Sequence, residues 1–472
     1  MSVDLLERLG TRFGVDRAVG YAVAARGWQL LTGQLTMLLI VFCLTDVEQG
    51  YYYAFFYLLA MQIFVELGLH VVIINVASHE WSQLQIVDDR IAGEPDALSR
   101  LASLSRMAGR WYLLAACVFV VAITIAGYVY FNWPTGRIPA GLNTLDWAVP
   151  WTSLVALTGM QLALLPLTSI LEGCGQLPTI NRIRFWQGVA GSAVVWAMMY
   201  AGFGLWALSG SAAVRLCGET YLVRSRFGPF FRSLRDADAG QQIDWKTEVV
   251  PLQWRIAIQG TLHWFATHLA GLVIFKCHGE AMGGRFGLMW TVLTAMQSAS
   301  MAWVETRRPL FGQLIAEQNY EELDQLFFRL SRYSLLLIAI GGTLFTAGVY
   351  VVNSFPNTVF TQIASRVPDA WSTGVFSMAF FALQPALCTN IYVRAHKRDP
   401  FLIPAVVSSL TVAVLVFWLG RAYGIVGSGY AYLFSISIVQ TPLWLFVWHR
   451  GKNSWHTEPA RTASTSSGTS QK

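Results

Sequence analysis

The sequence predicts an all-α polytopic membrane protein with about twelve transmembrane helices, arranged in two parallel six-helix lobes around a central cleft. Three observations lead to this prediction. The chain of 472 residues is 54% hydrophobic and only 13% charged, whereas soluble domains carry about 25% charged residues. Apolar runs long enough to cross a bilayer recur from end to end. The two halves of the chain also repeat the same order of features, as some transporters do.

The apolar runs define the expected helices. In the first half they occupy residues 22–44, 51–76, 109–131, 148–171, 185–202 and 204–223. In the second half they occupy residues 249–275, 281–304, 333–352, 371–393, 401–419 and 424–448. We therefore expect an amphipathic cytoplasmic N-terminus (1–21), an N-terminal lobe (22–223), a cytoplasmic linker (224–248), a C-terminal lobe (249–448) and a disordered cytoplasmic tail (449–472).

The distribution of basic residues predicts the orientation in the membrane. If both termini lie on one side, the loops on that side hold 25 of the 33 Lys and Arg residues, and the opposite loops hold five. Loops rich in Lys and Arg remain in the cytoplasm. We therefore expect both termini to be cytoplasmic. Because most basic residues flank the apolar spans, they also argue against a nucleic-acid-binding domain, which would gather basic residues on one soluble face.

Matching features in the two halves support the repeat. A Leu-Ser-Arg sequence enters the third run of each half, at 104–106 and at 330–332, and each follows an amphipathic stretch. The fourth run of each half contains a proline, Pro166 or Pro385, which is typical of kinked transporter helices. Because six spans return the chain to its starting side, the halves should be parallel repeats.

Polar residues in the first and seventh runs are candidates for substrate binding, since each charge inside a span is costly unless it faces protein or water. These candidates for a central cavity are Arg26, Gln29, Gln34, Arg255, Gln259 and His263. Guanidinium groups there would suit a phosphate or pyrophosphate, which arginine binds through paired donors. Arg26 and Arg255 lie close enough to the cytoplasmic end to act as interfacial anchors instead.

Two ionisable pairs lie within the spans. Glu66 and His70 are four residues apart on the second helix, so they should share one face and form a hydrogen-bonded pair. Such a pair can relay protons, which makes it the candidate for energy coupling, or it can simply satisfy its own polar groups. Arg215 and Glu219 have the same spacing, and we expect a structural ion pair.

The sequence gives little evidence for catalysis or metal binding. Asp46 and Glu48 follow the first span, where we expect them to be solvated. The sequence contains no HExxH, GxGxxG or Walker motif, and His263 and His268 are spaced too widely around a helix to hold one metal. We therefore predict no catalytic residues, no metal site and no cofactor, and we do not expect an enzyme.

The chain resembles the multidrug, oligosaccharidyl-lipid and polysaccharide exporter superfamily, in particular its bacterial lipid-linked oligosaccharide flippases. The resemblance lies in the polar first and seventh helices and in three segments, EQGYYYAFFYLLAMQIFVELGLHVVIINVASHEW (48–81), PLQWRIAIQG (251–260) and MAWVETRRPLFGQLIAEQNYEELDQLF (301–327). It implies alternating access, a cationic cavity for a sugar pyrophosphate that includes Arg26 and Arg255, and a polyprenyl tail left in the lipid.

This resemblance implies a role in surface polysaccharide or lipopolysaccharide biosynthesis at the bacterial cytoplasmic (inner) membrane. We expect a monomer whose partners are the lipid-linked oligosaccharide and the bilayer, with a polysaccharide polymerase or glycosyltransferases as candidate protein partners. One alternative is an ion-coupled multidrug or small-molecule antiporter of the same superfamily, for which Glu66 would be the only deep acidic residue. A membrane glycosyltransferase or acyltransferase is the third possibility, and no catalytic constellation in the sequence supports it.

Overall fold

Two helical lobes make up the chain, in a computed structural model that describes residues 28, 32–133, 145–237, 240–355, 358–396 and 400–455. Helices occupy nearly all of the described residues, which confirms the predicted all-α polytopic fold. The N-terminal lobe contains the helix Thr32–Cys43, α3 (Asp46–Leu59), the 3-10 turn η1 (Ala60–Gln62), α4 (Ile63–Glu66), α5 (Leu69–Trp81), β1 (Leu84–Val87), β2 (Arg90–Gly93), α6 (Pro95–Asn132), α7 (Ala148–Gly173), α8 (Leu177–Tyr200), α9 (Trp206–Tyr221), η2 (Leu222–Arg226) and α10 (Gly228–Asp236).

The second half of the chain follows a similar order. It contains η3 (Trp245–Val249), α11 (Val250–His278), α12 (Glu280–Glu305), α13 (Arg308–Ala316), α14 (Tyr320–Ser354), α15 (Thr358–Ala364), α16 (Ala370–Ala395), α17 (Leu402–Leu415), η4 (Val416–Gly420), α18 (Arg421–Phe434), η5 (Ser435–Gln440) and α19 (Thr441–Trp455). The helical run from Leu402 is divided at Gly424, whose φ of 64° is not helical. Glycine adopts this conformation readily because it has no Cβ.

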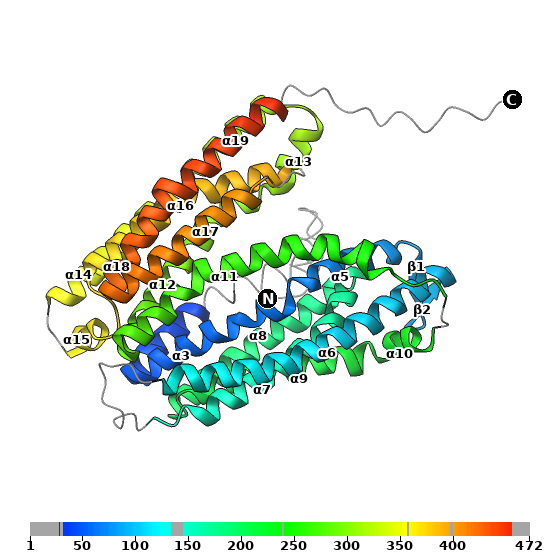
Figure 1. Cartoon of the computed structure of the whole chain (residues 1–472), viewed down its shortest axis with the longest axis horizontal. Coiled ribbons are helices and arrows are strands. Elements are labelled where there is room, and N and C mark those ends of the chain that lie inside the picture. The colour runs from blue at the N-terminus through cyan, green and yellow to red at the C-terminus, as the bar shows by residue number, and fades with distance from the viewer. Residues whose placement is uncertain are drawn as a thin grey trace, which may run out of the picture.

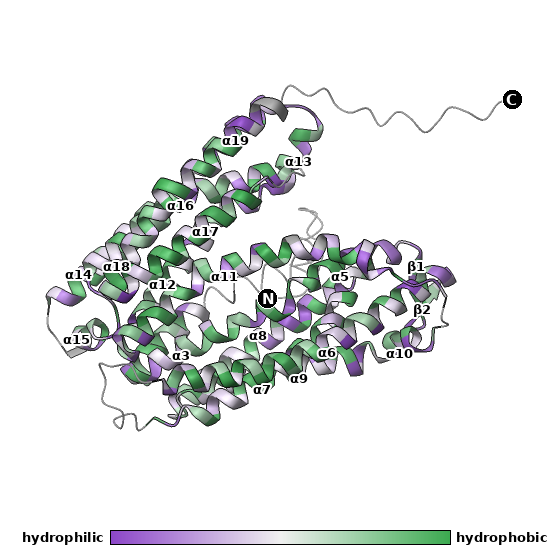
Figure 2. Cartoon of the chain, viewed as in Figure 1, coloured by the Kyte–Doolittle hydropathy of each residue, from purple (hydrophilic) through white to green (hydrophobic). Residues whose placement is uncertain are grey.

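Membrane spans can be recognised from length and composition. In the described part of the chain, five helical runs are long and apolar enough to cross a bilayer, and a bent pair, Asp46–Glu66 with Leu69–Trp81, makes a sixth. Apolar residues cover the middle of the helices, whereas polar residues gather where β1, β2, α10 and α13 lie (Figure 2). Helices α8, α11 and α12 are of similar length but carry more polar residues. The protein is therefore a multi-pass membrane protein.

Corresponding helices of the two halves have matching forms. Helices α6 and α14 are 38 and 35 residues long, and each includes the amphipathic stretch that precedes its span. Helices α7 and α16 are both 26 residues long, and their internal prolines are Pro166 and Pro385. These likenesses agree with the repeat, whereas the exact lobe boundaries stay a prediction.

A small β-hairpin interrupts the loop expected between the second and third spans. Strands β1 and β2 pair antiparallel, with Val87 opposite Arg90. The turn between them consists of Asp88 and Asp89, both with positive φ (53° and 60°), as a two-residue hairpin turn requires. The hairpin and α10 together cap one end of the N-terminal lobe, which we call the hairpin end.

The lobes meet at the opposite end of the molecule. Helix α3 of the N-terminal lobe packs along α12 of the C-terminal lobe, and from this contact the two lobes diverge toward the hairpin end (Figure 1). We call the α3–α12 junction the closed end. Helix α11 runs beside the N-terminal lobe and joins α12 at the closed end (Figure 1).

Candidate functional site

The helix that carries Glu66 and His70 is broken between them. Leu67 and Gly68 have φ values of 52° and 65°, a left-handed conformation that ends α4 and bends the span by 48°. A Cβ at Gly68 would lie 2.2 Å from the side chain of Ile256 on α11. The expectation that the pair lies on one continuous helix is therefore wrong.

The pair nevertheless forms across the break. Nδ1 of His70 contacts Oε1 of Glu66, and the Glu66 side chain is only 8% exposed. Tyr112 of α6 is fully buried and lies within electrostatic range of Glu66. A buried carboxylate held by one imidazole can exchange a single proton with it, so the geometry permits a proton relay as well as a purely structural pair.

A second ion pair lies near the first. Arg184 of α8 donates a 2.6 Å hydrogen bond to Glu172 at the end of α7, and both lie within electrostatic range of His70. Helices α7 and α5 approach closely here because Gly173 of α7 has no side chain. A Cβ at Gly173 would lie 2.7 Å from the backbone oxygen of Ile74 on α5. Ionisable groups thus continue from the broken helix toward the hairpin end.

Arg215 does not form the ion pair expected from the sequence. Its carboxylate neighbour, Glu219, is in electrostatic range, but in the described ranges no carboxylate lies within 4.0 Å of the exposed Arg215 guanidinium. Tyr52 of α3 is also within electrostatic range of Arg215. Within a span, such as the one the sequence predicts at 204–223, a cation without a hydrogen-bonded counter-ion is costly unless water or an anionic ligand reaches it.

The predicted cavity residues are not all placed. Arg26 and Gln29 lie outside the described residues, as does the side chain of Arg255. Gln34 is exposed on the helix Thr32–Cys43, which is joined to α8 by a 2.9 Å hydrogen bond from Trp196 to Thr36. The roles of these residues in binding stay a prediction.

Helix α11 carries the remaining candidates. His263 is exposed and Gln259 is half-buried. His268 stacks on Trp264, with ring centroids 6.1 Å apart, and also contacts the ring of Phe56 on α3. Trp264 and His268 therefore lie on the face of α11 that packs against α3.

An arginine joins the two lobes at the closed end. Arg366, in the turn between α15 and α16, is 9% exposed. It donates a 2.5 Å hydrogen bond to the carbonyl oxygen of Leu44 and lies 2.7 Å from a carboxylate oxygen of Asp46. Gln49 completes the contact, because its amide donates to the carbonyl oxygens of Gly284 and Arg366, at 2.9 and 3.2 Å.

We expected Asp46 and Glu48 to be solvated, but both form specific contacts. Asp46 pairs with Arg366, and Glu48 belongs to the capping box that begins α3. The Glu48 amide donates to Oγ1 of Thr45 at 3.2 Å, and the Thr45 amide donates to the Glu48 carboxylate at 2.8 Å. The pattern Thr-x-x-Glu at 45–48 is the sequence signal for this cap.

Glycines allow the close contact between α3 and α12. A Cβ at Gly50 would lie 2.1 Å from the carbonyl oxygen of Glu280, and a Cβ at Gly287 would lie 2.2 Å from the ring of Tyr53. No larger residue fits either position without separating the helices. The closed end is therefore a tight interface between the lobes.

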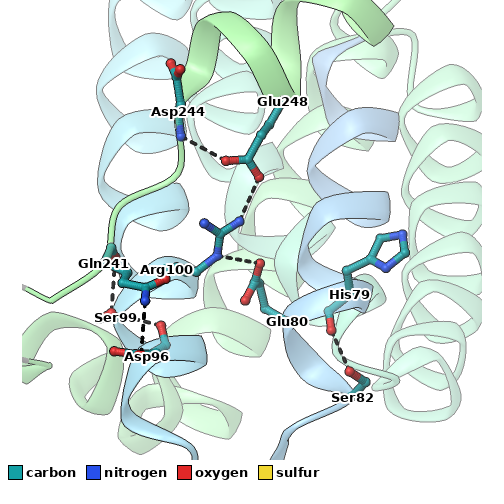
Figure 3. Close-up of polar contacts among 9 residues, drawn as sticks. All are labelled: His79, Glu80, Ser82, Asp96, Ser99, Arg100, Gln241, Asp244 and Glu248. Carbon is teal, nitrogen blue, oxygen red and sulfur yellow. Dashed lines mark hydrogen bonds and ion pairs between the residues drawn. The ribbon is translucent and has the colours of Figure 1, made fainter. Parts of the chain in front are cut away.

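The linker is fastened to the N-terminal lobe at the hairpin end (Figure 3). Arg100 of α6 donates to Glu80 of α5 at 2.9 Å and to Glu248 of η3 at 2.7 Å. These bonds, above all the one to Glu80, raise the pKa of Arg100. Gln241 of the linker donates to Asp96 at 3.1 Å. The start of α11, which directly follows η3, is thereby held against the N-terminal lobe.

The last turn of α11 is held by the other lobe. Nε2 of His278 lies 2.9 Å from the carbonyl oxygen of Gly420. Between its ends, Trp264 donates to the carbonyl oxygen of Tyr57 on α3 at 3.3 Å, and the Tyr432 hydroxyl of α18 donates to the carbonyl oxygen of Ala266. Helix α11 thus has partners in both lobes.

Comparison with known proteins identifies the fold. No family model and no curated sequence matches the chain. The lipid II flippase MurJ in an inward closed conformation aligns with a TM-score of 0.61 at 12% identity, over 91% of this chain and 87% of that one. The chain therefore shares its fold with this flippase.

Multidrug transporters share this fold. DinF-BH, a MATE multidrug transporter, aligns with a TM-score of 0.60 at 12% identity, over 94% of this chain and 97% of that one. A MATE transporter of the MOP superfamily in its inward-facing conformation gives 0.58 at 11% identity, over 90% and 99% of the two chains. An outward-facing one gives 0.50 at 12% identity, over 94% and 96%. At sequence identities of 11% and 12%, these alignments show a shared fold and nothing about substrate.

Proposed function

We propose that the protein is an alternating-access transporter that flips a polyprenyl-pyrophosphate-linked oligosaccharide across the bacterial cytoplasmic membrane for surface polysaccharide biosynthesis. The unpaired guanidinium of Arg215 is the observation that carries this proposal. It lies on α9, in the run 204–223 that the sequence predicts to cross the membrane, and no carboxylate among the described residues lies within 4.0 Å of it. A pyrophosphate would supply the anionic partner that the fold itself does not.

The arrangement of the lobes supports the alternating-access part of the proposal. The lobes are sealed at the closed end and diverge at the hairpin end (Figure 1), and the TM-score is higher for the inward-facing relative than for the outward-facing one. Together with the basic residues of the hairpin-end loops, this favours a cytoplasmic hairpin end. Reporter fusions within 224–248 should then read as cytoplasmic, and fusions near Gly141 as periplasmic.

Replacing Arg215 tests the substrate class. Arg215→Ala should abolish translocation of a lipid-linked oligosaccharide in proteoliposomes, and Arg215→Lys should restore only part of it, because an ammonium group lacks the planar fork of the guanidinium. The matched control is Arg232→Ala, an exposed arginine of the linker helix α10. Full translocation by Arg215→Ala, with normal membrane insertion, would refute the pyrophosphate role.

An ion-coupled drug antiporter of the same fold is the second candidate. Glu66, a buried carboxylate within a span, is the observation in its favour, since a cationic drug needs an acidic partner. However, Glu66 is already engaged by His70. Drug efflux that depends on Glu66 and is unaffected by Arg215→Ala would favour the antiporter over the flippase.

A further inference from the structure

Helix α14 carries a pocket on its surface near its start, at the end of the C-terminal lobe that lies away from the closed end (Figure 1). The pocket has a volume of about 460 Å³. It is lined by Gln325, Phe328, Arg329, Arg332 and Tyr333. Their spacing of three, four, seven and eight residues places all five on one face of the helix. The pocket thus combines two cations with two aromatic rings.

Neither arginine has an ion-pair partner within 4.0 Å in the part of the chain that the structure describes. The nearest acidic residue in sequence, Asp324, is engaged elsewhere. It pairs with Lys452 of α19 and accepts a 2.9 Å hydrogen bond from the Tyr392 hydroxyl. Glu321 lies one helical turn before Gln325 and accepts a weak 3.4 Å hydrogen bond from its side chain. Two positive charges therefore remain available to an anion.

An apolar stripe continues from this pocket along α14. From Arg332, every fourth residue is a large exposed hydrophobic side chain: Leu336, Ile340 and Leu344 are 58%, 56% and 67% exposed. The stripe ends about 18 Å from Arg332 along the helix, close to the thickness of one leaflet's hydrocarbon layer, roughly 15 Å. We expect lipid to cover these side chains in the membrane, which would put the pocket at the level of the headgroups.

We propose that Arg329 and Arg332 bind the phosphate headgroup of an anionic phospholipid whose acyl chains lie along Leu336, Ile340 and Leu344. Basic pockets beside membrane helices suit such headgroups, and the rings of Phe328 and Tyr333 lie at the depth where aromatic side chains prefer to sit. The Nζ atom of Lys452 lies 5.8 Å from the centroid of the Phe328 ring, but its charge is balanced by Asp324.

Lipid binding by the purified full-length chain tests this proposal. Phosphatidylglycerol should raise the unfolding midpoint more than phosphatidylcholine with the same acyl chains. The double variant Arg329→Gln, Arg332→Gln should bind phosphatidylglycerol about twenty-five-fold more weakly, since each guanidinium that contacts the phosphate should contribute roughly fivefold. Binding measured by native mass spectrometry should show the same loss.

The N-terminal lobe offers a matched control. Arg106→Gln with Arg110→Gln removes two exposed arginines of α6, of which Arg106 corresponds to Arg332 in the repeat, so it makes the same change in net charge. The control should bind phosphatidylglycerol like the wild type, and equal losses in both double variants would overturn the proposal. Inorganic phosphate is the second arm. If it stabilises the chain as much as phosphatidylglycerol does, the site binds a free anion and the lipid proposal is overturned.

Discussion

Arg366 and Asp46 lie 320 residues apart in sequence, yet the guanidinium of one is 2.7 Å from the carboxylate of the other. One belongs to the C-terminal lobe and the other to the first turn of α3, so the pair joins the lobes at the closed end. Opening this end would break the pair together with the hydrogen bond from Arg366 to Leu44. The contact therefore stabilises the conformation in which the closed end is sealed.

Replacing Arg366 with glutamine should shift the protein toward a state with the closed end open. The effect should be on the order of 1 kcal/mol, or about fivefold in the population ratio, because Asp46 is 41% exposed and solvent screens the pair. Spin labels on the exposed residues Val149 and Trp371, one in each lobe, can report the separation. Arg285→Gln is the control, since Arg285 donates to Ser365 within the C-terminal lobe. An unchanged distance distribution in Arg366→Gln would contradict the prediction.

A side chain at Gly287 should separate α3 from α12. Gly287→Val places carbon atoms where the Tyr53 ring now lies, 2.2 Å from the Cβ position, so the closed end cannot seal and transport should fall strongly. Gly348→Ala on α14 is the control, because its Cβ would meet no atom within 4 Å. The prediction fails if Gly287→Val transports at the wild-type rate.

Neutralising Glu66 tests the coupling role of the buried pair. Glu66→Gln keeps the side-chain volume and can still hydrogen-bond to His70, but it cannot take up a proton. We predict that the variant folds and inserts but no longer responds to a proton gradient across proteoliposomes. Undiminished gradient dependence would show instead that the pair only satisfies its own polar groups.

Removing the charge of Arg100 should detach the linker from the N-terminal lobe. Arg100→Gln should lower the free energy of unfolding by about 1–3 kcal/mol, because both Glu80 and Glu248 lose a charged donor. The raised pKa of Arg100 means that its contribution is lost only as the pH rises above the ordinary arginine value. The difference between wild type and variant in chemical unfolding should therefore not shrink between about pH 6 and pH 9. A difference that vanishes by pH 9 would contradict this account.

The apolar runs located most helices well. The run at 148–171 corresponds to α7 at 148–173, and the run at 371–393 lies within α16 at 370–395. Such spans are set by local composition, because a bilayer demands about 20 apolar residues wherever the chain crosses it. The hairpin of β1 and β2 was missed because its short strands have little apolar alternation, and its turn depends on two aspartates with positive φ.

The polar contacts were harder to predict than the spans. Spacing alone suggested an ion pair between Arg215 and Glu219, but rotamers and neighbouring helices decide whether residues four apart actually touch. The break at Leu67 and Gly68 depends on how closely α11 approaches Gly68. The contact between Asp46 and Arg366 joins distant segments, and no local pattern in a single sequence encodes such a contact.

The two ends of α11 are fastened to different lobes, the first through Glu248 and Arg100 and the last through His278 and Gly420. Across its 29 residues, the helix spans about 44 Å. A rod held in this way cannot travel as a rigid part of either lobe. Any rocking of the lobes must therefore appear as bending or twisting within α11, so the elastic stiffness of this one helix contributes directly to the energy barrier between the two conformations.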